Sequence, residues 1–221
     1  MTTLRRPRAL CARTVFACAL AFAACAGAAP TAVQITELCK DAEDQAHCGR
    51  LIEQAQMKRL PGMAERAGDE LRVTLFPTGV VTFRDSVPVS GAKTFALWDY
   101  LDRINAVVLF ATDGEQTGFV LLQRTTGKQF RLPSEPTLSP DRQHLVTADF
   151  CASGCEGELA VWSVTRDDVR KTLAWKPPAP WSDANAVWKD ADTLRVEYTV
   201  DGETSPRTLE RRLDASGWAK R

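Results

Sequence analysis

The sequence predicts a mainly β protein: an antiparallel β-meander with propeller-like repeats, preceded by a short helical hairpin. Two patterns support this prediction. After residue 68, short segments that alternate apolar and polar residues recur about a dozen times, each bounded by turn residues. Helical periodicity is confined to residues 35–66. Because strand spacing does not fix how a sheet closes, a barrel and a two-sheet sandwich remain alternatives.

The first residues have the features of an export signal. A positively charged start is followed at residues 14–24 by an apolar run too short to span a bilayer. The charged positions are Arg5, Arg6, Arg8 and Arg13. Ala-Gly-Ala at residues 26–28 fits an ordinary signal peptidase, whereas residues 22–25 resemble the bacterial lipobox and would make Cys25 the site of lipidation. We therefore expect a periplasmic or secreted protein, with a membrane-anchored lipoprotein as the alternative.

The chain is expected to divide into a signal peptide at residues 1–28, a helical segment at 29–67 and an all-β domain at 68–221. Basic and acidic residues number 28 each, and four of the basic ones lie in the signal, so the remainder has a net charge of 24 − 28 = −4. An acidic chain without a Lys/Arg stripe argues against a nucleic-acid partner. No G-x-G-x-x-G or P-loop pattern occurs, so no nucleotide cofactor is expected.

The helical segment contains an apolar face that ends at Pro61-Gly62. The face comprises Ile35, Leu38, Leu51, Ile52, Ala55 and Met57. In one unbroken helix nine residues rise about 13.5 Å, whereas bridged cysteines have Cα atoms about 4.4–6.8 Å apart. A disulfide between Cys39 and Cys48 therefore requires a break near residues 41–46, which would make the segment a helical hairpin.

Four cysteines lie beyond the signal, and an exported protein favours disulfides between them. They are Cys39, Cys48, Cys151 and Cys155. The two most local pairings are the simplest of the three connectivities. A bridge between Cys151 and Cys155 would clamp a loop tip in which Gly154 permits a tight turn.

The expected strands follow one another with turn residues between them. They cover residues 71–75, 80–83, 107–110, 119–123, 128–132, 144–148, 159–164, 169–175 and 194–200. The last has the clearest alternation, which places Leu194, Val196, Tyr198 and Val200 inside. Loosely repeated units cover about residues 103–133, 141–177 and 187–218.

Part of this pattern resembles a known repeat. Ser139-Pro140-Asp141 precedes a strand, and hairpins ending in Val161-Trp162 and Leu173-Ala174-Trp175 follow it, as in the WD40-like propeller repeats of periplasmic TolB-like proteins. Those repeats favour Gly where Arg142 stands. The chain also resembles exported proteins of Gram-negative bacteria without established catalytic residues, through residues 48–53, Asp99-Tyr100-Leu101 and the Ser-Pro-Asp turn. The resemblance implies a propeller-like fold and no particular chemistry.

Few residues are suited to catalysis. Only His47 and His144 could act as a histidine base, and no G-x-S-x-G elbow occurs. We expect His47 to face solvent and His144 to be a partly buried structural residue. Four carboxylates around one connection, Asp99, Asp102, Asp113 and Glu115, could support acid–base chemistry, although a solvated acidic loop is the simpler interpretation.

Metal binding and partner binding have one candidate each. His144, Asp149, Cys151 and Cys155 lie within twelve residues and could hold zinc, but a disulfide is favoured in an oxidising compartment. Most tryptophans should be core residues. Trp181 follows the segment Pro177-Pro178-Ala179-Pro180, so we expect an exposed loop side chain that could anchor a partner.

The function best matched by these features is a non-enzymatic envelope protein that binds another envelope or exported protein, as an inhibitor or accessory module. A carboxylate-dependent hydrolase acting on cell-wall or glycan substrates is one alternative, and a structural lipoprotein attached to the membrane through Cys25 is another. The sequence assigns no catalytic, cofactor-binding or metal site, and it does not predict an oligomeric state.

Overall fold

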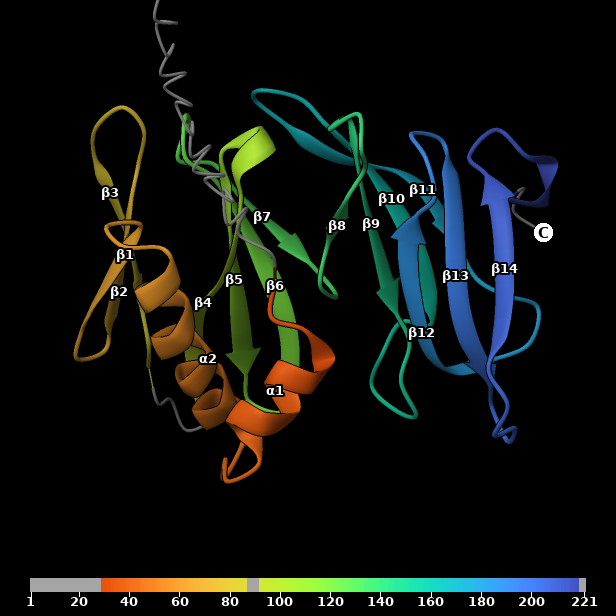
Figure 1. Cartoon of the computed structure of the whole chain (residues 1–221), viewed down its shortest axis with the longest axis horizontal. Coiled ribbons are helices and arrows are strands. Elements are labelled where there is room, and N and C mark those ends of the chain that lie inside the picture. The colour runs from red at the N-terminus through yellow and green to blue at the C-terminus, as the bar shows by residue number, and fades with distance from the viewer. Residues whose placement is uncertain (1–28, 87–91, 219–221) are drawn as a thin grey trace, which may run out of the picture.

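The computed structural model describes residues 29–86 and 92–218, and within them the fold is mainly β, as predicted. Fourteen strands form four antiparallel sheets in this part of the chain, and two helices lie at its N-terminal end (Figure 1). The expected export signal, including Cys25, lies outside the described residues.

Each sheet is a meander in which strands that are neighbours in sequence are neighbours in space. Sheet 1 contains β1 (Ala64–Ala67), β2 (Glu70–Thr74) and β3 (Val80–Arg84). Sheet 2 contains β4 (Lys93–Leu101), β5 (Ala106–Asp113), β6 (Gln116–Gln123) and β7 (Gln129–Leu132). Sheet 3 contains β8 (Thr137–Leu138), β9 (His144–Asp149), β10 (Glu158–Val164) and β11 (Val169–Trp175). Sheet 4 contains β12 (Trp181–Trp188), β13 (Thr193–Val200) and β14 (Arg207–Arg212).

The four sheets stack face to face in a row, as successive propeller blades do (Figure 1). Three apolar cores fill the spaces between them. Leu71 and Leu109 belong to the core between sheets 1 and 2, Leu121 and Leu145 to the core between sheets 2 and 3, and Leu194 to the core of sheets 3 and 4. The barrel alternative is wrong for the described residues, because their strands pair only within four separate sheets.

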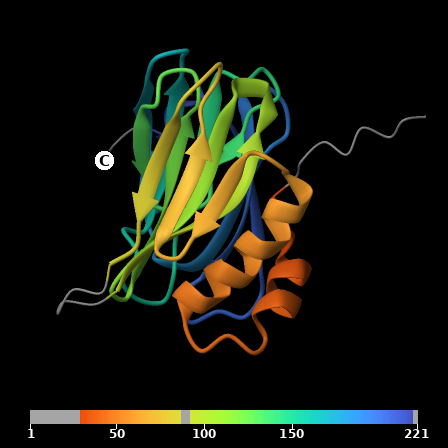
Figure 2. The same ribbon diagram turned by 90° about the vertical axis from the view of Figure 1, so that its left-hand side faces the viewer.

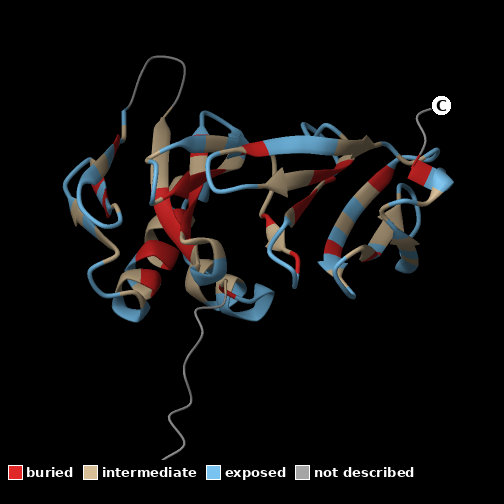
Figure 3. Cartoon of the chain, turned by 90° about the horizontal axis from the view of Figure 1, so that it is seen from above, coloured by how far each residue is buried: buried red, intermediate tan, exposed pale blue. Residues whose placement is uncertain are grey.

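The two end sheets carry many exposed residues (Figure 3), and charged residues are among them. On sheet 1, Arg72 Nη2 lies 2.7 Å from Glu70 Oε2. On sheet 4, Lys189 Nζ lies 2.5 Å from Glu210 Oε2. Such polar faces end a stack of sheets, as capping repeats do in repeat proteins.

The N-terminal segment is a helical hairpin, as predicted, with α1 (Ala32–Cys39) and α2 (Gln45–Arg59) separated by a break and joined by the disulfide between Cys39 and Cys48. Thr31 caps α1 in a capping box, and the Asp44 side chain caps α2. The helices lie along one side of the sheets (Figure 2). Ile52 of α2, 1% exposed, packs in the same core as Trp98, so the helices are part of the β structure's core.

Two boundaries differ from the prediction. The helical segment was expected to reach residue 67, but α2 ends at Arg59 and β1 already occupies Ala64–Ala67. The short polar sequence of β1 does not predict a strand, because its strand conformation depends on pairing with β2. The alternation in β13 is confirmed in the first half of the strand, where Leu194 and Val196 are buried and Arg195 and Glu197 are exposed. Tyr198 and Val200, expected inside, are partly buried against the core of sheets 3 and 4.

Candidate functional site

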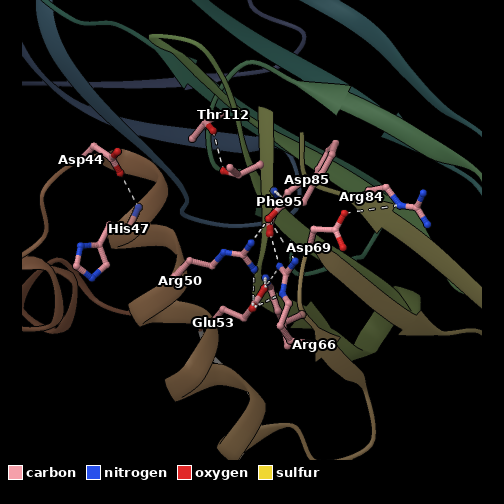
Figure 4. Close-up of polar contacts among 12 residues, drawn as sticks. Asp44, His47, Arg50, Glu53, Arg66, Asp69, Arg84, Asp85, Phe95 and Thr112 are labelled. Carbon is pink, nitrogen blue, oxygen red and sulfur yellow. Dashed lines mark hydrogen bonds and ion pairs between the residues drawn. The ribbon is translucent and has the colours of Figure 1, made fainter. Parts of the chain in front are cut away.

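The outer edge of β4 is covered by charged side chains (Figure 4). β4 pairs with β5 on one side, and on its other side it forms only an isolated bridge between Lys93 and Ser86 among the described residues. The backbone groups beyond Lys93 on that side therefore need different partners. The Phe95 N–H donates to Asp85 Oδ1 (2.9 Å), and the Leu97 N–H donates to Glu53 Oε2 (3.1 Å). The Phe95 carbonyl accepts from Arg66 Nη2 at 2.5 Å. These contacts protect the edge from pairing with another strand.

The same side chains form a buried ion-pair network between α2 and sheets 1 and 2. Glu53, 2% exposed, accepts two bonds from Arg66, at 2.8 and 2.7 Å. Arg50 pairs with both Glu53 and Asp85. Burial and the nearby Arg66 charge lower the pKa of Arg50. Since every member bonds another member or the β4 backbone, the network has a structural role.

His47 lies beside this network and faces solvent, as expected. Its N–H donates to the capping Asp44 Oδ1 (2.7 Å), and its Nδ1 accepts from the Glu43 N–H (3.3 Å). No nucleophilic side chain among the described residues bonds its ring. Both bonds join His47 to residues at the start of α2, so His47 helps to stabilise the first turn of that helix.

The four expected carboxylates do not form one cluster. Asp99 is 4% exposed, whereas Asp102, Asp113 and Glu115 are exposed. Asp113 lies at the far end of β5 from Val108, the residue that Asp99 opposes. The expectation of one acidic loop is wrong, because strand β5 separates Asp99 and Asp102 from Asp113 and Glu115.

A β-bulge explains the burial of Asp99. The ladder pairs Leu97 with Leu109 and Asp99 with Val108, so the register shifts at Trp98. Burial raises the pKa of Asp99 to about 6, against the opposing effects of the Tyr100 backbone N–H and of the Arg59 guanidinium, 3.3 Å away.

A second acid, partly buried, lies near Asp99, and the sequence did not predict its role. Glu135 accepts a bond from Trp98 Nε1 (2.8 Å), and burial raises its pKa. Trp98 and Glu135 are 37 residues apart in the chain, so no local pattern indicates their contact. The two acids give this region a candidate acid–base pair.

The candidate zinc ligands do not converge. Cys151 and Cys155 form a disulfide. His144 packs against Trp188 with ring centroids 6.0 Å apart and is partly buried, as expected. Among the residues that the structure describes, no group of three or more His, Cys, Asp or Glu side chains is placed to hold a metal ion.

Residues 151–156 form an exposed loop, here named the clamped loop, between β9 and β10. Three restraints hold it. The disulfide closes its tip, the buried Asp149 carboxylate accepts from the Glu156 N–H (2.9 Å), and Lys176 Nζ donates to the Glu156 carbonyl (2.8 Å). An exposed loop with this many restraints is preorganised.

A cleft lies beside the clamped loop, between sheets 2 and 3. It encloses about 430 Å³, and Glu156 of the clamped loop is part of its wall. Its other walls include Thr117 and Phe119 of β6, Arg131 of β7 and Trp162 of β10. This inter-sheet cleft and the clamped loop form one continuous candidate binding region.

The prediction that Trp181 is an exposed loop side chain is wrong. Trp181 begins β12 and is 8% exposed. Its ring stacks on Tyr198 at 3.9 Å and contacts Phe150 and Trp175. The proline-rich segment ends directly before the strand, so the tryptophan enters the core of sheets 3 and 4.

Two further observations concern membrane-spanning helices and similarity to known proteins. None of the helices in residues 29–86 and 92–218 is long and apolar enough to cross a membrane. Comparisons of the chain with protein-family models, curated proteins and solved structures find no match.

Proposed function

We propose that the protein acts outside the cytoplasm by binding another envelope or exported protein through the clamped loop. The observation that carries the proposal is the combination of exposure and restraint in residues 151–156. A loop that is already ordered loses little conformational entropy on binding, so more of the contact energy contributes to affinity. An inhibitor or accessory module would use the loop in this way.

The location outside the cytoplasm has two supports. The two disulfides fit an oxidising compartment, and the first 28 residues have the pattern of an export signal. A lipid on Cys25 would add membrane attachment. Partition of the wild type and of Cys25→Ser between soluble and membrane fractions distinguishes release from anchoring.

Co-purification tests the binding proposal. The full chain is captured from its native envelope, and mass spectrometry identifies bound proteins and the mature N-terminus. Ala152→Arg places a large charged side chain on the exposed loop, and Ala191→Arg makes the same change in the exposed β12–β13 turn. We expect one stoichiometric partner that Ala152→Arg loses and Ala191→Arg keeps. A partner retained equally by both variants would contradict the role of the loop.

The hydrolase alternative has one favourable observation, the raised pKa values of Asp99 and Glu135. It is less well supported because Asp99 is 4% exposed, which leaves little of the carboxyl group for a substrate to reach. Hydrolysis of cell-wall or glycan substrates that disappears in Asp99→Asn would favour it over the binding proposal.

A further inference from the structure

The open part of the β6 edge lies in the inter-sheet cleft. β6 has eight residues and pairs with β5 along its whole length, whereas β7 has four residues and covers only Phe119–Leu122 of β6. Leu132 is the last residue of β7, and Pro133 follows it without an N–H. The first three residues of β6 therefore have a strand on one side only.

The orientation of the β6 backbone indicates which groups are open. The Gln123 N–H donates to the Lys128 carbonyl, on the β7 side. Backbone groups alternate between the two neighbours of an antiparallel strand, and the β6 ladders have no register shift, so those of Thr117 point to the same side as those of Gln123. No hydrogen bond joins the Thr117 N–H or carbonyl to another described residue on that side.

One basic side chain in the wall of the cleft is available to pair with a carboxylate of a ligand. Three basic side chains line it, Lys93, Arg131 and Lys171, against two acidic ones, Asp113 and Glu156. Lys93 and Lys171 have acidic partners, at 3.7 and 2.6 Å. Arg131 has no ion-pair partner among the described residues and is exposed. Lys93 and Lys171 are thus neutralised by their partners, and Arg131 is the basic group of the wall that a ligand's carboxylate can approach.

We propose that the inter-sheet cleft binds an extended segment of a partner protein that carries an acidic side chain. The segment pairs its main chain with the N–H and carbonyl of Thr117, in the position that a longer β7 would occupy. Its carboxylate pairs with Arg131, and an apolar side chain contacts Phe119 and Trp162. This inference rests on the proposed function and names the chemistry of the partner.

Peptide binding tests the inference without the natural partner. The probe is a set of fluorescein-labelled peptides of about six residues, alternating Val and Thr, with one Glu moved through each position. A matched set carries Lys in place of Glu. Fluorescence anisotropy on the full folded chain should show at least one Glu peptide binding about tenfold more tightly than its Lys counterpart.

Variants locate the binding. Thr117→Pro removes the cleft-facing N–H without removing a β5 ladder bond, so it should weaken binding about tenfold, whereas Thr117→Ala keeps the N–H and should bind like the wild type. Arg131→Gln should weaken binding of the Glu peptide, and Arg166→Gln, an exposed arginine in the β10–β11 turn, should not.

The inference is overturned if no Glu peptide binds better than its Lys counterpart, or if Arg131→Gln leaves binding unchanged. If the peptide tests fail in either way but Ala152→Arg loses the captured partner, the cleft inference is rejected and the clamped-loop proposal stands. Binding of the Glu peptides without any captured partner would support the cleft and count against the proposed function.

Discussion

The two disulfides among the described residues lie in very different surroundings. The bridge between Cys39 and Cys48 joins α1 to α2, and both cysteines pack against the core that contains Ile52. The bridge between Cys151 and Cys155 closes a loop that is exposed from end to end. The first bridge joins two helices at the core, whereas the second closes an exposed surface loop.

The physical reason lies in what each bridge constrains. A disulfide stabilises a fold mainly by restricting the unfolded chain, and the effect remains only where the bridged segment must be ordered in the folded state. The helical hairpin must be ordered because α2 supplies Glu53 to the β4 edge. The clamped loop can loosen while the sheets around it remain intact.

The largest expected effect concerns the ion-pair network beneath the helical hairpin. Glu53→Ala leaves Arg66 and the Leu97 N–H without their partner, which should lower the free energy of unfolding by about 3–5 kcal/mol. Urea denaturation measures this change in the free energy of unfolding. Glu37→Ala is the control: it breaks an exposed pair with Lys40 and should cost below about 1 kcal/mol. Equal effects would refute a structural network.

Removal of the helical bridge should have the next largest effect. The chain-entropy relation for a ring of this size gives about 3 kcal/mol for Cys39→Ser with Cys48→Ser. The expected result is a lower urea midpoint with an unchanged slope. A midpoint equal to that of the wild type would mean that α1 can detach without cost.

Asp99, near the end of α2, should make stability depend on pH. Burial raises its pKa to about 6, so the folded protein holds this proton more tightly than the unfolded chain. The stabilisation is complete below about pH 4 and is lost as the pH rises to about 6, a change of about 3 kcal/mol. Asp99→Asn should therefore be more stable than the wild type at pH 7. Asp102→Asn, at an exposed neighbour, is the control. Parallel pH profiles for the wild type and Asp99→Asn would contradict the assignment.

A smaller effect is expected in sheet 3, at the end of β9 opposite the clamped loop. Arg142 has a φ of 67°, in the left-handed region that favours glycine. Arg142→Gly should raise the free energy of unfolding by about 0.5–1 kcal/mol, after the greater flexibility of glycine in the unfolded chain is included. Thermal unfolding measures the change, and a lower midpoint would show that the arginine side chain contributes more than the strain costs.

The local features of the fold could be predicted from sequence. The spacing of Cys39 and Cys48 indicated the break between the helices, and the alternation in residues 194–200 gave the buried face of β13. β4 was not predicted, because the bulge at Trp98 interrupts its alternation. Features that depend on distant segments were missed as well.

The candidate site shows the same limit. The loop tip followed from Gly154, which permits a tight turn, and its bridge from the local spacing of Cys151 and Cys155. The burial of Trp181 depends on Tyr198 and Phe150, which are distant in sequence. The open edge at Thr117 depends on the length of β7, which the sequence of β6 does not contain.

The smallest expected effect on stability belongs to the clamped loop, and a matched pair of double variants tests the central claim directly. Cys151→Ser with Cys155→Ser should lower the free energy of unfolding by below about 1 kcal/mol and weaken binding of the captured partner at least about tenfold. The chain-entropy relation gives about 2 kcal/mol for a ring of this size, and we expect less because an exposed loop can loosen in the folded state as well. Cys39→Ser with Cys48→Ser, measured where it is still folded, should lose about 3 kcal/mol and bind like the wild type. Wild-type binding by the loop variant, or binding losses that follow stability in both variants, would contradict the claim that the clamped loop is the binding surface.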